Sequence, residues 1–256
     1  MTQDLAGRIA LVTGAGNGLG RAIALALAGA AARVILVGRT EKTLRETADL
    51  IGQPGDVLVA TCDVASPESV DALRESLAGE DIDLLVNNAG IGGPVKEITD
   101  IEPAEWDEVF GVNVRGVYLM CQAFLPAMYR RGSGDVINVA SVTGKRPLTR
   151  RTPYAASKMA VLGLTRTLAF EAGPRGVRVN SLSPGPCRGQ RRRNFTREAA
   201  ATGTTYEQAE EAFVARAALH RLVEEDEVAA AVLAMLRMPG LCGADIDLSA
   251  GMIAPA

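Results

Sequence analysis

The chain has 256 residues, of which 48% are hydrophobic and 22% are charged, and its formal net charge is −3. This size and composition allow one large domain or two small ones with a substantial buried core. The net negative charge argues against a nucleic-acid partner, no apolar run approaches the ~20 residues that span a bilayer, and no secretion signal opens the chain, so we expect a cytoplasmic protein without a membrane partner.

Short β-branched and leucine-rich runs alternate along the chain with longer amphipathic or alanine-rich stretches. The pattern predicts strands near Arg8–Thr13, Arg33–Val37, Val57–Cys62, Leu84–Asn87, Asp135–Ala140, Arg178–Ser183 and Asp245–Leu248. It predicts helices near Leu19–Gly29, Glu41–Leu50, Pro67–Leu77, Pro103–Arg131, Pro153–Gly173 and Glu224–Met238. The alternation implies right-handed βαβ crossovers, and so an α/β fold: a doubly wound, Rossmann-like parallel sheet of about seven strands with helices on both faces.

No Pro/Gly/Ser-rich linker and no fixed-period repeat divides the chain, so residues 1–256 are expected to form a single domain. The region 185–222 stands apart, because it follows a strand, carries the basic run RGQRRRNF and then shows only weak helical periodicity. A long insertion of this kind is often an active-site lid. We therefore expect a substrate lid at about 185–222.

The first expected strand runs directly into the glycine-rich stretch TGAGNGLGRAIALALA. Glycines lack a Cβ, so backbone N–H groups and the following helix N-terminus can approach a pyrophosphate. Leu19 stands where G-x-G-x-x-G would place its last glycine, but Gly14, Gly18 and Gly20 satisfy G-x-x-x-G-x-G. With a strand before it and a helix after it, the turn is expected to bind a nucleotide; the alternative is a merely structural turn.

The second expected strand ends in VILVGRT. In dinucleotide folds an acid at this point binds the adenosine ribose hydroxyls, whereas a nearby arginine accommodates a 2′-phosphate. Here Gly38 opens space and Arg39 supplies a guanidinium suited to phosphate oxygens. NADP(H) is the expected cofactor, and NAD(H) stays possible because Asn17 in the glycine loop adds no second positive charge.

A tyrosine and a lysine stand four positions apart in the stretch RTPYAASKMAVLGL. On a helix, Tyr154 and Lys158 share one face, so an ammonium group lies beside a phenol and favours its ionised form. The alternative is that Tyr154 is half packed and that Lys158 lays its aliphatic stem over apolar surface.

Metal-binding and thiol chemistry find little support. The four cysteines form no C-x-x-C pair, and the single histidine, His220, has no second histidine beside which to build a zinc site or a Ser-His-Asp triad. We expect buried cysteines and no metal site.

Several motifs occur together in one order: TGAGNGLG, then CDV at Cys62–Val64, NNAG at Asn87–Gly90, Asn113, Ser141 thirteen positions before Tyr154, YAASK, and SPG at Ser183–Gly185. Over nearly its whole length the chain resembles the compact short-chain dehydrogenase/reductases. The resemblance implies an NAD(P)-dependent oxidoreductase that interconverts a secondary alcohol and a ketone by hydride transfer.

The resemblance also implies roles for individual residues. Tyr154 would be the general acid/base, Ser141 would donate a hydrogen bond to the same substrate oxygen, Lys158 would tune the phenol and hold the nicotinamide ribose, and Asn113 would support a proton-relaying water. Taken singly, Asn113 could instead bond backbone within its helix. The implied cofactor-binding residues are Gly14, Gly16, Asn17, Gly18, Leu19, Gly20, Arg39, Asp63, Val64, Asn88, Ala89, Gly90, Tyr154, Lys158, Pro184 and Gly185.

Two basic segments flank the Tyr–Lys pair, one with Lys145, Arg146, Arg150 and Arg151, the other with Arg188, Arg191, Arg192 and Arg193. They could attract an anionic substrate or an acidic carrier protein, or be a solvated face. Two stretches depart from the family pattern: Ser249-Ala250-Gly251 replaces Asp-Gly-Gly, and SPGPCRG lacks a threonine, which leaves backbone near Pro184–Cys187 to meet the nicotinamide amide.

Other functions are weighed against the oxidoreductase. A non-catalytic dinucleotide-binding sensor or scaffold could have lost any of the four catalytic residues, yet all are present. Nucleotide-sugar epimerases and dehydratases normally carry a further substrate domain, and an enoyl reductase would space its tyrosine and lysine more widely. The resemblance suggests a homodimer or homotetramer built through the helices Pro103–Arg131 and Pro153–Gly173.

Overall fold

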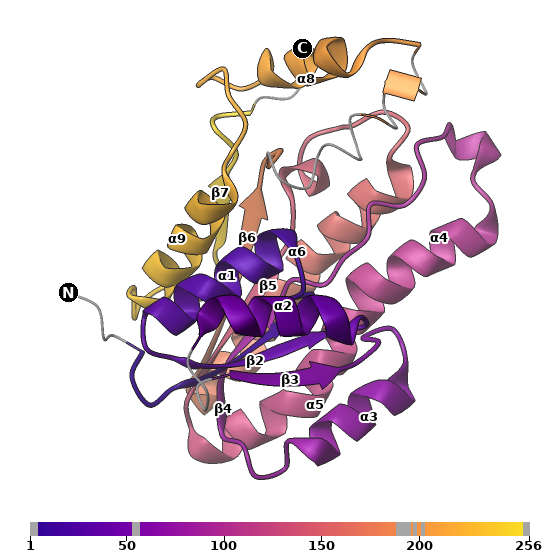
Figure 1. Ribbon diagram of the computed structural model, residues 1–256. Coiled ribbons are helices and arrows are strands. Elements are labelled where there is room, and N and C mark those ends of the chain that lie inside the picture. The colour runs from indigo at the N-terminus through magenta and orange to yellow at the C-terminus, as the bar shows by residue number, and fades with distance from the viewer. Residues whose placement is uncertain (1–4, 53–56, 188–195, 197–198, 201–202, 253–256) are drawn as a thin grey trace.

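Seven parallel strands form one sheet at the centre of the molecule, which is a computed structural model describing residues 5–52, 57–187, 196, 199–200 and 203–252 (Figure 1). The strands are β1 (Ile9–Thr13), β2 (Arg33–Gly38), β3 (Val57–Thr61), β4 (Ile82–Asn87), β5 (Gly134–Val139), β6 (Val177–Pro184) and β7 (Asp245–Leu248). Their order is β3-β2-β1-β4-β5-β6-β7, and every neighbouring pair is parallel. The expected doubly wound α/β fold is confirmed.

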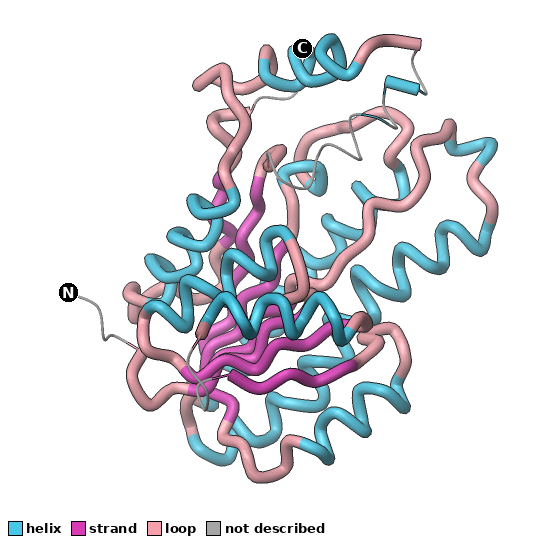
Figure 2. Tube along the Cα trace, in the orientation of Figure 1, coloured by secondary structure: helices cyan, strands magenta, loops and turns pink. Residues whose placement is uncertain are grey.

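Helices cover both faces of this sheet, as the cyan tubes around the magenta strands show (Figure 2). They are α1 (Gly18–Gly29), α2 (Glu41–Ile51), α3 (Pro67–Ser76), α4 (Pro103–Phe110), α5 (Gly116–Arg131), α6 (Thr152–Ala172), α8 (Tyr206–Val214) and α9 (Glu225–Leu236). Because successive strand residues point to opposite faces, Leu36 of β2 belongs to the apolar cluster that includes residues of α1, α2 and α9, whereas Ile35 belongs to the cluster that includes residues of α3, α5 and α6. Two apolar layers therefore enclose the sheet.

One predicted helix differs from the structure. The expected helix Pro103–Arg131 is divided by a π-helical turn, Gly111–Arg115 (η2), which joins α4 to α5. A π-helical turn inserts one residue into the hydrogen-bond ladder and frequently lies at a functional site. The apolar periodicity continues on both sides of the turn, so the sequence pattern does not reveal it. Asn113 lies within this turn.

Strand order locates the candidate site. The chain winds outward from β1 through β2 to β3 and then returns to β4 on the other side of β1. At such a reversal the two following loops diverge and leave a crevice at the carboxyl ends of the strands, where ligands of open α/β sheets bind. Gly14 follows β1 and Asn88 follows β4, so both lie at this crevice.

The described part of the expected lid includes α8, which lies beyond the ends of β6 and β7 (Figure 1). Ala209 of α8 packs with Val142, which follows Ser141, in a small third apolar cluster. The basic residues Arg188, Arg191, Arg192 and Arg193 lie outside the described residues. The lid and the single-domain organisation stay predictions. No helix in the described ranges is long and apolar enough to cross a bilayer, and the cytoplasmic location also stays a prediction.

Candidate active site

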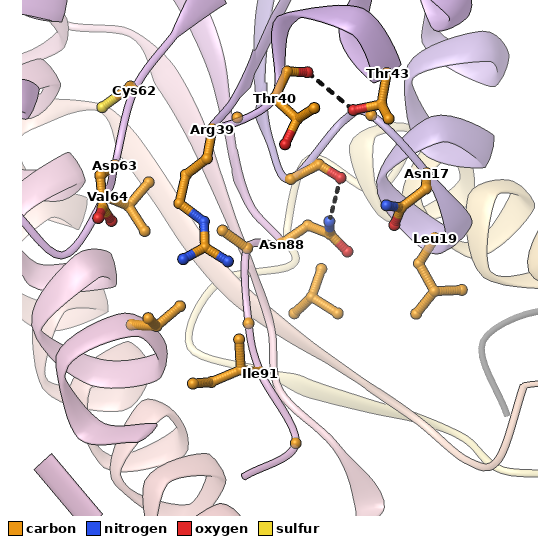
Figure 3. A pocket seen from close by; sticks show the side chains of 18 of the residues that line it. Asn17, Leu19, Arg39, Thr40, Thr43, Cys62, Asp63, Val64, Asn88 and Ile91 are labelled. Atoms are coloured by element: carbon orange, nitrogen blue, oxygen red, sulfur yellow. Dashed lines mark hydrogen bonds between the residues drawn. The ribbon is translucent and has the colours of Figure 1, made fainter. Parts of the chain in front are cut away.

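A cleft of about 300 Å³ opens at the carboxyl ends of β1, β2 and β4 and reaches the first turns of α6 (Figure 3). It brings together residues that lie up to 144 positions apart in the chain, from Gly14 to Lys158. The residues expected from the sequence that line it are Gly14, Gly16, Asn17, Leu19, Arg39, Asp63, Val64, Asn88, Ala89, Gly90, Tyr154 and Lys158. Gly18, Gly20, Asn113, Ser141, Pro184 and Gly185 do not line it.

The glycine loop at the start of the cleft has no room for side chains. Gly14 has a φ of +67°, and a Cβ there would lie 2.9 Å from Asn88 Nδ2. A Cβ on Gly20 would lie 2.1 Å from the Gly14 carbonyl oxygen, so only glycine lets α1 pack on the loop. Asn88 Nδ2 also donates to the Thr13 carbonyl oxygen at 2.9 Å. The motif residues of β1 and β4 therefore form one rigid wall.

The N-terminus of α1 fits a pyrophosphate. Asn17 occupies the N-cap position, but its side chain makes no capping hydrogen bond. The first-turn N–H groups of α1 thus lack the side-chain acceptor that usually satisfies such donors, and they stand at the positive end of the helix dipole. An anionic phosphate oxygen is the natural acceptor for them.

Arg39 lies at the end of β2, where Figure 3 shows its guanidinium projecting over the cleft. The side chain is exposed, and within the described part of the chain it has no hydrogen-bond or ion-pair partner. Thr40 and Thr43 also line the cleft, near Arg39, and neither residue was predicted from the sequence. Thr40 ends the VILVGRT stretch and Thr43 follows three positions later, and this closeness to Arg39 is the signal that could have found them.

Lys158 is buried in the wall of the cleft, with 5% of its surface exposed. Its Nζ donates to the Val139 carbonyl oxygen at 2.8 Å and lies 5.9 Å from the centre of the Tyr154 ring. Burial lowers the pKa of Lys158, and the neighbouring Tyr154 acts against that shift. The alternative of a lysine stem spread over surface is wrong, because the ammonium group itself is enclosed.

Asn113 is fully buried and bonds to two other segments. Its Oδ1 accepts from Ile91 N at 2.8 Å, and its Nδ2 donates to the Ile91 carbonyl oxygen and to Ser157 Oγ, both at 3.0 Å. Ser157 Oγ in turn donates to the Tyr154 carbonyl oxygen at 2.8 Å. The side chain of Asn113 therefore does not bond backbone within its own helix. Instead it connects the loop after β4 to the helix of Tyr154.

Ser141 lies at the end of β5, beside α6. Its Oγ accepts a hydrogen bond from Thr143 N at 3.2 Å, which leaves its proton free to be donated. Gly144 presses on α6 so closely that a Cβ there would lie 2.9 Å from the Lys158 carbonyl carbon. The turn that follows Ser141 is therefore packed on the helix that carries Tyr154 and Lys158.

The remaining expected cofactor residues, Pro184 and Gly185, lie at the end of β6. Gly185 N donates to the Leu248 carbonyl oxygen of β7 at 2.8 Å, and a Cβ on Gly185 would lie 2.8 Å from Ser249 Cα. Both residues are thus held by the edge strand rather than placed in the cleft wall. Their contact with a cofactor stays a prediction.

The basic segment before Tyr154 does not form the free cationic patch considered from the sequence. Lys145 Nζ lies 2.6 Å from Asp245 Oδ2, Arg146 lies 2.6 Å from Asp247, and Arg150 lies 3.1 Å from Glu97. Arg151 is buried instead of exposed. The sequence does not predict these ion pairs, because the carboxylates lie far from the basic residues along the chain.

Cysteine burial is as expected for Cys62, Cys121 and Cys187, whereas Cys242 is exposed. Burial raises the pKa of Cys121 to about 12, so its thiol stays protonated. Among the described residues, no group of three or more His, Cys, Asp or Glu side chains is arranged to hold a metal ion.

Comparisons with known proteins show the family to which the chain is similar. A family model described as short chain dehydrogenase matches residues 8–200. D-threitol dehydrogenase of Mycolicibacterium smegmatis is 40% identical over 185 residues, which cover 70% of each chain. Among solved structures, an actinorhodin polyketide ketoreductase with NADPH is 31% identical with a TM-score of 0.90, and the match covers 98% of each chain. NAD⁺-bound xylitol dehydrogenase is 26% identical with a TM-score of 0.92, over 97% of this chain and 100% of that one.

Proposed function

The chain belongs to the short-chain dehydrogenase/reductase family of oxidoreductases, and from this premise we propose that it interconverts a secondary alcohol and a ketone, with Tyr154 as general acid/base and NADP(H) as preferred cofactor. The observation that carries the proposal is the enclosed ammonium of Lys158, 5.9 Å from the Tyr154 ring in the wall of the cleft. Burying an ammonium group costs free energy, and here the group lies beside a phenol whose ionised form a positive charge stabilises.

The residues of the cleft fit a dinucleotide. The N-terminus of α1 and the loop Gly14–Gly18 would hold the pyrophosphate, Asp63 and Val64 would contact the adenine, and Lys158 would hold the nicotinamide ribose. When bound, the nicotinamide supplies a hydride for reduction or accepts one in oxidation. The relatives with solved structures include one with NADPH and one with NAD⁺, so the preference depends on this chain's own residues.

Arg39 supports the preference for NADP(H). Its guanidinium stands at the end of β2, lines the cleft and is unpaired within the described chain. An arginine at this position is suited to a 2′-phosphate, because charge-assisted hydrogen bonds to phosphate are strong and directional. No carboxylate occupies the β2 end, where it would repel the phosphate; Gly38 stands there instead.

The proton chemistry of the proposal belongs to the side chains of Tyr154 and Ser141. In reduction, Tyr154 would donate its phenolic proton to the ketone oxygen, and in oxidation it would accept the hydroxyl proton. Ser141 would donate a hydrogen bond to the same oxygen, since Thr143 N occupies only an acceptor site of its hydroxyl. Asn113 would hold the loop after β4 against α6; the water that it is expected to support stays a prediction.

The experiment that tests this function follows NADPH and NADH absorbance while ketones are screened, and follows NADP⁺ and NAD⁺ reduction with alcohols. Polyols and ketoacyl thioesters come first, because the relatives are named as polyol dehydrogenases and a polyketide ketoreductase. Turnover that Tyr154→Phe abolishes supports the proposal. Tight cofactor binding without turnover of any compound would favour the non-catalytic sensor or scaffold.

A homo-oligomer built through α5 and α6 is part of the proposal. Tyr118 of α5 and Met159 and Phe170 of α6 are large apolar side chains exposed on the isolated chain, and Phe170 is 85% exposed. Their burial in a subunit interface would remove this apolar surface from water. Light scattering is expected to give a dimer or tetramer, whereas a monomer would contradict this arrangement.

A further inference from the structure

A buried arginine stands directly before the helix of Tyr154 and Lys158. Arg151 is 5% exposed, its Nη2 donates to the Gly92 carbonyl oxygen at 3.0 Å, and its Cζ lies 5.5 Å from the centre of the Tyr154 ring. Burying a cation is unfavourable, and placing it at the positive end of a helix adds to the cost. Such a placement persists only where surrounding contacts, or a function, maintain it.

The preceding residue carries a second unfavourable feature. Arg150 has a φ of +61°, a left-handed conformation that non-glycine residues rarely adopt. Its carbonyl oxygen accepts from Lys96 N at 3.0 Å, and its Nε donates to Glu97 at 3.1 Å. With the bond from Arg151 to Gly92, these contacts fasten the segment 92–97 to the start of α6. Strained backbone of this kind clusters at functional sites.

The fastened segment belongs to the cleft. Gly92 lines the cleft, as do Gly90 and Ile91, which lead into it from β4. Arg151 therefore joins the cleft wall to Tyr154, because its guanidinium donates a hydrogen bond to Gly92 and makes a cation–π contact with the Tyr154 ring.

The Tyr154 ring has two cations near it, which differ in how they respond to pH. Lys158 Nζ lies 5.9 Å from the centre of the ring, and Arg151 Cζ lies 5.5 Å from it. Burial lowers the pKa of Lys158, so its charge is lost as the pH rises, whereas a guanidinium stays charged throughout.

We propose that Arg151 is a positioning residue for Tyr154: it holds the ring against the Gly92 segment and keeps a permanent positive charge beside the phenol. That charge would favour the phenolate, the form of Tyr154 that would accept the hydroxyl proton of the alcohol; a bound oxidised nicotinamide would supply the hydride acceptor. The inference rests on the proposed function of Tyr154.

The test is an ultraviolet difference titration of tyrosinate in the full-length protein, which needs no substrate. Wild type, Arg151→Gln and Arg151→Lys are each paired with the same protein carrying Tyr154→Phe, so that the signals of Tyr118, Tyr129 and Tyr206 subtract. In Arg151→Gln the midpoint of the Tyr154 signal is expected about one pH unit higher, the size expected when a unit charge about 6 Å away is removed. Arg151→Lys is expected to lie between, since it keeps a charge but loses the planar fork.

The structure offers a matched control. Arg175 lies 4.5 Å from the centre of the Tyr129 ring, so Arg175→Gln removes an arginine from a different tyrosine. This variant is expected to leave the Tyr154 midpoint unchanged. An unchanged Tyr154 midpoint in Arg151→Gln, or an equal shift of that midpoint in Arg175→Gln, overturns the proposal. If Arg151→Gln does not fold, the Tyr154 midpoint of Arg151→Lys decides the proposal.

The pH profile of alcohol oxidation separates the two proposals. Once a substrate is found, the acidic limb of kcat/KM in Arg151→Gln is expected to move upward by the same amount as the tyrosinate midpoint. A wild-type protein without turnover would contradict the proposed function, yet the titration would still decide whether Arg151 acts on Tyr154. Turnover by the wild type, with the acidic limb of kcat/KM and the Tyr154 midpoint both unchanged in Arg151→Gln, would contradict only the role of Arg151.

Discussion

Asn113 and Ser157 are joined by a hydrogen bond of 3.0 Å that connects the π-helical turn Gly111–Arg115 to α6. Ser157 passes the connection on, since its Oγ donates to the Tyr154 carbonyl oxygen at 2.8 Å. The helix of Tyr154 and Lys158 is thereby held by a side chain from a turn 44 positions earlier in the chain.

Tyr154→Phe is expected to lower kcat at least a hundredfold, because it deletes the transferable proton while keeping the ring. Cofactor affinity is expected to stay nearly unchanged. Steady-state kinetics and a fluorescence titration with NADPH measure the two effects. A near-normal kcat would remove Tyr154 from the mechanism.

Lys158→Met is expected to abolish turnover and weaken cofactor binding, yet to leave the protein as stable as wild type or about 1 kcal/mol more stable at pH 7. The reason is that burial lowers the pKa of Lys158 below 10.5, so the charged form is penalised in the folded state. This penalty is fully present below the folded-state pKa and disappears as the pH rises to 10.5.

Urea unfolding of both proteins at several pH values measures this linkage. The stability gap between Lys158→Met and wild type is expected to narrow as the solution is made alkaline. A variant that is clearly less stable at pH 7 would show that the bond from Lys158 to Val139 outweighs the burial of its charge.

NADP(H) is expected to be preferred over NAD(H) by tens to a hundredfold in kcat/KM, because a charge-assisted hydrogen bond to the 2′-phosphate contributes about 1.5–3 kcal/mol. The double change Gly38→Asp, Arg39→Leu is expected to reverse the preference, since the aspartate would repel the phosphate and accept the ribose hydroxyls. Both cofactors are compared at one fixed ionic strength, because an exposed contact of this kind weakens with salt. A wild-type preference for NAD(H) would show that Arg39 is not the selector.

Ala31→Gly is expected to raise the free energy of unfolding by about 0.5–1 kcal/mol. Ala31 follows α1 with a φ of +67° and is exposed, so a glycine there relieves backbone strain without removing packing. The neighbouring Ala30 has a φ of −92° and is buried, so Ala30→Gly serves as the control and is expected to destabilise. Chemical denaturation of the two variants checks the contrast; a less stable Ala31→Gly protein would be the opposite result.

Glu227 is expected to make the free energy of unfolding depend on pH in the acid range. Two hydrogen bonds from Arg221 and one from Glu224 N lower the pKa of Glu227 from 4.5 to about 2. Because the folded-state pKa is depressed, this stabilisation is present above pH 4.5 and is lost as the pH falls toward 2. Glu227→Gln is expected to be less stable than wild type at neutral pH and to flatten the decline between those values; an unchanged slope would assign the acid sensitivity to other carboxylates.

The parallel sheet, the shared helix face of Tyr154 and Lys158, and the glycine turn could be predicted from the sequence, because they depend on local spacing. Alternating strand and helix periodicities predict the parallel sheet, with bounds that the structure moves by only one or two residues in most elements. The i, i+4 spacing of Tyr154 and Lys158 puts both on one face of a helix in any fold that keeps that helix. Gly14 and Gly20 mark a turn without side chains, since a Cβ on either would contact neighbouring atoms closer than 3 Å.

The tertiary structure alone decided which charges are available and what holds the catalytic helix. Lys145 and Arg146 read as a cationic patch until the fold brings Asp245 and Asp247 to them from about 100 positions away. Arg151 reads as one more surface arginine, yet the loop after β4 and the Tyr154 ring enclose it. Such contacts follow from the order of strands in the sheet, which brings the loop after β4 to the start of α6 and strand β7 to the turn after β5. A local sequence pattern carries no information about which distant segments will meet.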